Sequence, residues 1–135
     1  MAVTYSTTLK SNRMQIVADL VAGKTFAAST GSATAGTLVI GTSALSGATG
    51  VLATFTLGST PGTVSSGVLT VSGTPLTATA SATGTAAKAE FRDNAGNVIV
   101  SGLTVGTSSA DIIINATAIS TGQTVTLSSG SITHS

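Results

Sequence analysis

Few residues in this chain could carry out acid–base or nucleophilic chemistry. Its single histidine, His134, is the second-last residue of the sequence, where a side chain is expected to be solvated rather than held in place. A serine or threonine nucleophile needs an adjacent base to activate it. The 19 Ser and 26 Thr residues therefore do not predict a hydrolase, in spite of their number.

The carboxylates offer a second kind of acid–base chemistry. Those outside the expected helix are Glu90, Asp93 and Asp111. Two carboxylates across a glycosidic bond can hydrolyse it, but Glu90 alternates with Lys88 and Arg92, which predicts a charged stripe on the solvent-facing side of a strand. Asp93–Asn94 is typical of a tight turn, since calcium binding needs several converging oxygens. We therefore predict no catalytic residue, no cofactor and no metal site, and hence a protein that is not an enzyme.

Charge and composition exclude further classes. Charged residues make up 7% of the chain and the net charge is +1, which is too little basic charge for a nucleic-acid partner. The absence of cysteine excludes thiolate nucleophiles and disulfides and suits assembly in a reducing cytoplasm. The sequence contains neither a long apolar run nor a signal-peptide pattern, so we expect no membrane insertion and no secretion. Aromatic residues are 3% with no tryptophan, which disfavours stacking on sugars.

One segment near the N-terminus has helical periodicity, and we predict a helix near residues 8 to 22. Its apolar stripe has spacings of three and four residues and comprises Leu9, Arg13, Ile16 and Leu20, with Val17 and Val21 beside it. Capping is expected from Ser6, Thr7 or Thr8, or from Asn12 with Gln15, and Gly23 with Lys24 provides a stop signal. The stripe is expected to pack on the protein's own sheet in preference to a partner. Residues 25 to 36 are expected to form an extended connector anchored by Phe26.

From residue 37 onward, short β-type runs are separated by turn residues at intervals near ten residues, which is typical of an all-β fold. The expected strands are Thr37–Thr42, Gly50–Leu57, Gly67–Ser72, Leu76–Thr83, Ala86–Arg92, Asn97–Val105, Asp111–Ile119 and Thr124–Thr133, the last with a possible break at Gly130. We predict a single domain over residues 1–135, an antiparallel β-sandwich that is jelly-roll-like, has about eight strands, and carries an N-terminal arm and amphipathic helix over about 1–24.

Several residues make local predictions within this fold. Apolar residues alternate from Val51 to Leu57, which places Phe55 in the core and Leu52 on the opposite face. Small residues at Ala78, Ala80 and Ala82 are expected to face inward and to give a thin core.

Turn and breaker residues make a second set of local predictions. Arg92–Asn97 is expected to be a hairpin turn with Gly96 in the left-handed conformation. Gly102 predicts a bulge, and Gly73–Pro75 a break in the strand ladder. The run Asp111–Asn115 is expected to form an inner strand or to be covered at an interface, because it would aggregate on an open edge.

Parts of the sequence resemble small virion proteins of tailed bacteriophages. The resemblance is carried by Thr4–Arg13, Gly36–Ile40, Val105–Asn115, Ile119–Val125 and Ser131–His134. It implies a structural protein of the phage particle, most simply a head decoration or cement protein that binds the major capsid protein and reinforces the shell. Known cement proteins include jelly-roll sandwiches, which agrees with the strand count expected above.

The resemblance also implies partners and a location. The partners would be the major capsid protein and further copies of this chain on the capsid surface of the virion, with assembly in the host cytoplasm and no contact with nucleic acid or membrane. Candidate contact residues are Tyr5, Ser6 and Thr7 in the N-terminal arm and Asp93, Asn94 and Asn97 at the hairpin tip. Two alternatives stay open, a neck, tail or fibre component of the particle and an adhesin or glycan-binding module.

Overall fold

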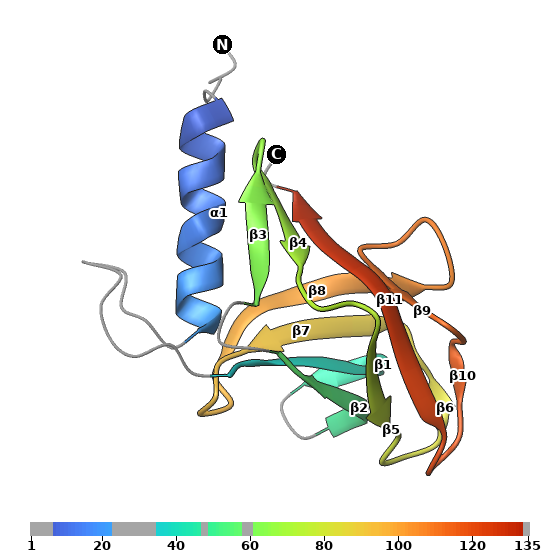
Figure 1. Cartoon of the computed structure of the whole chain (residues 1–135). Helices are drawn as coiled ribbons and strands as arrows, with labels where there is room; N and C mark the ends of the chain where they lie inside the picture. The colour runs from blue at the N-terminus through green and yellow to red at the C-terminus, as the bar shows by residue number, and fades with distance from the viewer. Residues whose placement is uncertain (1–6, 23–34, 47–48, 58–60, 134–135) are drawn as a thin grey trace.

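The computed structural model describes residues 7–22, 35–46, 49–57 and 61–133, and within these ranges the protein is mostly β-structure with one helix (Figure 1). The helix is α1 (Thr7–Val21). The strands are β1 (Thr37–Ser46), β2 (Thr49–Thr56), β3 (Gly62–Ser65), β4 (Val68–Val71), β5 (Leu76–Thr79), β6 (Gly84–Thr85), β7 (Lys88–Arg92), β8 (Val98–Gly106), β9 (Ile112–Ile114), β10 (Ala118–Ile119) and β11 (Thr124–Thr133). The proposed anchor Phe26, most of its connector and His134 lie outside the described residues.

Nine of these strands form one mixed sheet. Its order is β2-β1-β7-β8-β9-β11-β4-β3, with β5 also paired to β11, while β6 and β10 form a separate two-stranded sheet. The expected antiparallel pairing is wrong at one place, because β8 and β9 are parallel, with Val105 opposite Ile112 and Gly106 opposite Ile113. All other pairs among the described strands are antiparallel.

The sheet curls until β2, at one end of the strand order, approaches β5, which pairs with β11. β11 pairs successively with β5, β9 and β4 along its ten residues, and it crosses β7 and β8 steeply in Figure 1. Just after β5, the backbone N–H of Ser81 donates to the carbonyl of Leu52 in β2 at 2.8 Å. Since β2 stands at one end of the strand order, this bond joins the first strand of the sheet to the β11 side and encloses the core.

The enclosed core contains most of the large buried side chains. Phe55 and Phe91 are each 1% exposed and lie opposite Leu38 on either side of it, so the prediction for Phe55 is confirmed. Leu52 is also buried, contrary to the prediction. The pairing of β1 with β2 skips Leu52, and this bulge turns its side chain inward. The remaining members of the core are Val21, Ile40, Ala53, Leu57, Val71, Ala80, Ala86, Ala89, Leu103, Ile112, Ile114, Ile119, Val125 and Leu127.

The expected strands are confirmed in the main, but the described residues form eleven strands where about eight were expected, and several bounds differ. β3 was not expected, since Gly62–Ser65 is short and has no apolar alternation. The segment predicted as Asp111–Ile119 forms two strands, β9 and β10, that are separated where Asn115 Oδ1 accepts a hydrogen bond from the Thr126 N–H at 2.9 Å. β1 continues to Ser46, and β11 runs through Gly130 without a break.

The local predictions for breakers and small residues are confirmed. Gly102 has a φ of 76° and lies at a register shift between β7 and β8, which is the expected bulge. Gly73–Pro75 separates β4 from β5. Ala80 is buried, and Ala78 and Ala82 pack against the core.

The isoleucine run Ile112–Ile114 forms an inner strand, which is one of the two outcomes expected for Asp111–Asn115. β9 lies between β8 and β11 in the strand order. Ile112 and Ile114 are 0% and 2% exposed. The aggregation-prone segment is therefore paired on both sides within the fold.

Helix α1 has the expected bounds but buries a different face. The buried residues are Met14, Ala18, Val21 and Ala22, whereas Arg13 is exposed and Ile16 and Leu20 are only partly buried. Met14 and Ala18 pack with Leu69 of β4, supported by Val64 of β3 and Ile132 of β11. The hydroxyl of Ser11 accepts a hydrogen bond from the Gly67 N–H at 2.9 Å. The helix therefore packs on the protein's own sheet, as expected. Val17 and Val21, beside the predicted stripe, lie on the packed side, whereas Arg13, Ile16 and Leu20 of that stripe lie on the opposite side.

Gly36 lies where the end of the helix meets the sheet. A Cβ atom at this position would lie 2.6 Å from the carbonyl oxygen of Val21 and 2.7 Å from that of Arg92. Its own carbonyl accepts a hydrogen bond from the N–H of Leu57 at 2.9 Å. Glycine therefore allows the helix end, β7 and the end of β2 to meet at van der Waals distance.

Candidate functional site

The structure describes four of the six residues predicted to contact a partner. Tyr5 and Ser6 lie outside the described residues. Thr7 is the first residue of α1 and is exposed, and Asp93, Asn94 and Asn97 form the turn between β7 and β8. The start of α1 is at the top of Figure 1 and the β7–β8 turn is at the lower left, so the fold does not bring Thr7 and the turn together.

The β7–β8 turn is organised around the Asp93 side chain. Asp93 Oδ1 accepts hydrogen bonds from the N–H groups of Ala95 at 3.0 Å and Asn97 at 2.9 Å. Asp93 Oδ2 accepts one from Asn97 Nδ2 at 3.0 Å. The backbone N–H of Asp93 donates to the carbonyl of Asn97, and Gly96 has a φ of 88°. The prediction of a tight hairpin with a left-handed glycine is confirmed.

These hydrogen bonds stabilise the charged form of Asp93. The side-chain amide of Asn97, followed by the backbone N–H groups of the turn, lowers the pKa of the Asp93 carboxyl below its ordinary 3.8, against a smaller opposing effect of burial. A carboxylate whose pKa is lowered in the folded state stabilises that state above the unfolded-state pKa. This stabilisation is lost as the pH falls through the folded-state value.

We expect Asp93→Asn to remove this pH-dependent stabilisation. At pH 7 the variant should be less stable by about 1 kcal/mol, because an amide at this position accepts fewer hydrogen bonds than the carboxylate. Below pH 3.8 the difference from the unmodified protein should shrink, since Asp93 itself becomes protonated. Urea unfolding followed by circular dichroism at a series of pH values would measure this. A difference that is constant with pH would contradict the role given to the charge.

Asn94 is an exposed candidate contact at the turn. It is exposed at the tip, as are Ala95 and Asn97. Asp93 and Asn97 already hold the turn through their side chains, so their first effect is on its shape. The predicted contact therefore rests on Asn94, presented by a turn that Asp93 makes rigid.

Glu90 does not face solvent, so the predicted charged stripe is wrong at this position. Glu90 is 6% exposed, and its Oε2 accepts hydrogen bonds from Arg92 Nη2 at 2.8 Å and Arg92 Nε at 3.2 Å. Val39, which pairs with Glu90 across β1 and β7, is 2% exposed. This side of the sheet is therefore covered around Glu90, whereas Lys88 is exposed as predicted.

Asp111 has a third, separate structural role. Its Oδ2 accepts hydrogen bonds from the N–H and the hydroxyl of Thr104, both at 3.0 Å, and its N–H donates to the Thr104 hydroxyl at 3.0 Å. These bonds link the residue just before β9 to β8 and fix the unusually short connection between two parallel strands. The sequence signal for this link is an aspartate directly before an isoleucine run, but its threonine partner could not be identified from spacing.

The comparisons with known proteins add no further site. No protein-family model matches the chain, and neither the curated proteins nor the solved structures contain a significant match. Within the described ranges, no cluster of three or more His, Asp or Glu residues could hold a metal ion. The one helix in those ranges is too short and too polar to cross a membrane.

Proposed function

We propose that this protein is a capsid decoration or cement protein of a tailed bacteriophage, with no enzymatic activity. It binds the major capsid protein at the capsid surface of the virion, stabilises the shell, and acts there as several copies after assembly in the host cytoplasm. Its curled sheet serves as a jelly-roll-like sandwich. The resemblance of five sequence segments to small phage virion proteins supports this assignment.

One observation carries the structural part of the proposal: the carboxylates of the sheet region are engaged in hydrogen bonds and an ion pair within the fold. Glu90 binds Arg92, Asp93 binds the turn around Asn97, and Asp111 binds Thr104. Each carboxylate of the sheet region has its own partner and stabilises a different connection. This is the arrangement expected of a protein in which charged groups stabilise the fold.

The surface suits repeated weak contacts. Threonines lie opposite one another across β5 and β11, with Thr79 opposite Thr124 and Thr77 opposite Thr126, and Thr77, Thr79 and Thr124 are exposed. A surface of hydroxyl groups with few charges makes short hydrogen bonds without a large electrostatic contribution. On a symmetric shell, many such contacts add up to tight binding without a single dominant residue.

The proposed interface combines the arm residues Tyr5, Ser6 and Thr7 with the hairpin residues Asp93, Asn94 and Asn97. The copy number in purified virions, measured by quantitative mass spectrometry relative to the major capsid protein, tests the assignment. A near-stoichiometric ratio supports decoration. A few copies per particle would instead assign the protein to the neck, tail or fibre, and its absence from particles would overturn a virion role.

We expect Asn94→Arg to lower the copy number in particles at least severalfold, because a long charged side chain at the tip of a rigid turn cannot fit a surface matched to asparagine. Ser108→Arg is the matched control, since Ser108 is exposed in the β8–β9 connection outside the proposed interface. Both variants should keep the melting temperature of the unmodified protein. If the two variants had the same copy number in particles, the hairpin tip would not be part of the interface.

The glycan-binding alternative has less support. Sugar binding commonly uses exposed aromatic rings, whereas Phe55 and Phe91 are each 1% exposed in the core. Specific binding to a glycan array by the purified protein would favour this alternative over the capsid role.

A further inference from the structure

Helix α1 packs on the sheet through a small apolar cluster that is separate from the main core. The members of this cluster, which come from the helix and from strands β3, β4 and β11, are Met14, Ala18, Leu69, Val17, Val64 and Ile132. Val21, at the end of the helix, belongs to the main core instead, and Ile132 packs against both clusters. We call residues 7–18, the part of the helix that packs through the small cluster, the strap.

The strap lies beside one end of the sheet. Figure 1 shows α1 alongside β3, which is the last strand of the sheet order. The hydroxyl of Ser11 accepts a hydrogen bond from the N–H of Gly67, in the turn between β3 and β4, at 2.9 Å. These contacts join the helix to the β3–β4 hairpin and the end of β11, so separating them breaks no pairing between strands.

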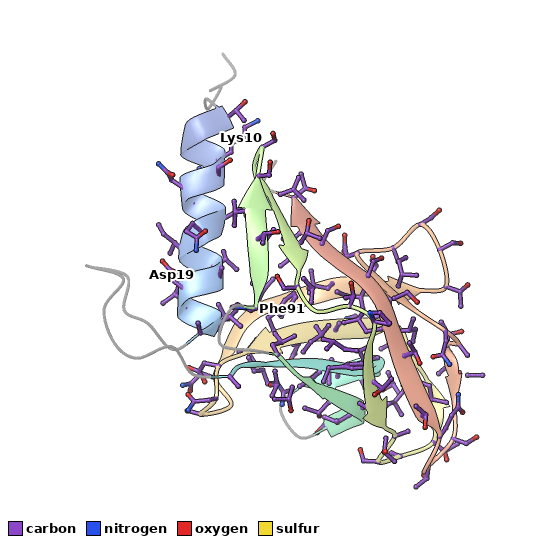
Figure 2. All side chains as sticks on the ribbon, in the orientation of Figure 1. Lys10, Asp19 and Phe91 are labelled. Atoms are coloured by element: carbon purple, nitrogen blue, oxygen red, sulfur yellow. The ribbon has the colours of Figure 1, made fainter. Side chains whose placement is uncertain are left out.

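The charges of α1 oppose helix formation. Lys10 lies in the first turn and Asp19 in the last turn, at opposite ends of the helix in Figure 2. This is the reverse of the distribution that stabilises a helix dipole. The hydrogen bond from Gln15 Nε2 to Asp19 Oδ1 at 3.1 Å supports the last turns, but it links the helix to itself and not to the sheet.

The helix therefore depends on its packing. A helix of 15 residues is marginal in water without tertiary contacts. Its β-branched residues lower the helix propensity further, and they are Thr7, Thr8, Ile16, Val17 and Val21. The strap is helical because it is docked on the hairpin, and it loses its helical structure when it leaves.

Val21 holds the other end of the helix in place. It is 0% exposed within the main core. A Cβ atom at Gly36 would lie 2.8 Å from its Cγ1, so the chain that enters β1 packs closely against it. This end of the helix is the fixed point about which the strap opens.

We propose that the strap is a conformational device: residues 7–18 leave the β3–β4 hairpin and lose their helical structure as one unit, while Val21 and the curled sheet stay folded. Such an opening is an order–disorder change of a single segment. It exposes Leu69 next to β3, so the docked strap shields this end of the sheet. The change takes place within one copy of the protein and stands or fails separately from the virion role.

The test is native-state amide hydrogen exchange of the purified full chain, followed by NMR at a series of urea concentrations. In the unmodified protein, the amides of residues 11–18 should have protection factors at least about tenfold lower than those of β1 and β7. Their dependence on urea should also be weaker, because opening of the strap exposes less surface than unfolding of the sheet. Equal protection and equal urea dependence of the two sets of amides would overturn the proposal.

Two substitutions on one face of β4 separate the strap from the sheet. Leu69 belongs to the small cluster, whereas Val71 belongs to the main core. Leu69→Ala should lower the protection of residues 11–18 at least about tenfold. Val71→Ala is the matched control. It should lower the protection of β1 and β7 but not that of residues 11–18, since Val71 keeps its contacts when the strap opens. An equal effect of Val71→Ala on both sets would show that helix and sheet open together, against the proposal.

Oxidation of Met14 gives a second measurement that does not depend on amide signals. Met14 is 3% exposed, so hydrogen peroxide converts its thioether to the sulfoxide only when the strap opens. The rate, followed by peptide mass spectrometry, should be at least about tenfold higher in Leu69→Ala than in the unmodified protein and unchanged in Val71→Ala. Equal rates in the two variants would also overturn the proposal.

Discussion

Phe91→Ala is expected to lower the free energy of unfolding by about 3–5 kcal/mol. The Phe91 side chain lies at the centre of the sheet, with Leu38 opposite it on β1 and Val100 opposite it on β8 (Figure 2). It is 1% exposed, so its removal leaves a cavity that strands on both sides cannot easily close. In a domain whose total stability is of the order of 5–15 kcal/mol, this loss leaves little margin for folding.

Urea unfolding followed by circular dichroism would measure the effect, because the chain has no tryptophan to serve as a fluorescent probe. Val98→Ala is the matched control, since Val98 is an apolar residue of the neighbouring strand that is 45% exposed. Its effect should stay within about 0.5 kcal/mol. If Phe91→Ala lowered the free energy of unfolding by less than about 1 kcal/mol, this would mean that the core does not close around the Phe91 ring.

Glu90→Ala is expected to cost about 3 kcal/mol of stability, the lower end of the range for breaking a buried ion pair. The change leaves the Arg92 guanidinium without the carboxylate that accepts hydrogen bonds from its Nε and Nη2. The Arg92 side chain is 14% exposed, so contact with solvent recovers only part of this loss. Lys88→Ala, on the same strand but at an exposed position, should change stability by less than about 0.5 kcal/mol.

A double-mutant cycle separates the ion pair from the other contacts of each residue. The variants are Glu90→Ala, Arg92→Ala and the double substitution, each measured by urea unfolding. The sum of the single effects should exceed the double effect by at least 1 kcal/mol, because the first substitution already breaks the pair. Additive effects would show that the two side chains do not stabilise each other.

Periodicity and breaker residues predicted most of the elements. The helix bounds, the β7–β8 turn, the Gly102 bulge and the inner position of Ile112–Ile114 all follow from short-range signals, namely residue spacing, left-handed glycine positions and β-propensity. These signals act within a few residues along the chain and do not depend on distant partners. β3 was missed because Gly62–Ser65 has no such signal and is held as a strand by its pairing with β4.

The burial of particular faces could not be predicted in the same way. Apolar residues surround much of α1, so spacing alone could not decide between the Ile16–Leu20 side and the Met14–Ala18 side. The smaller alanine allows close approach to Leu69, and only the position of β4 reveals this. Glu90 was placed on a solvent-facing stripe because alternating charges usually indicate exposure. Its burial depends on the pairing of β7 with β1, which lies some fifty residues earlier in the chain.

The central place of β11 has a consequence for how the protein is made. Strands β4, β5 and β9 are synthesised first, but each of them pairs with residues 124–133. Until β11 has been synthesised, the edges of these strands that pair with it are unpaired. The isoleucines of β9 are among the most aggregation-prone residues of the chain. Closure of the sheet therefore follows the synthesis of β11 rather than accompanying the growth of the chain. A polypeptide released before Thr124 lacks the strand that three others pair with, so only chains that extend through β11 can reach the folded state.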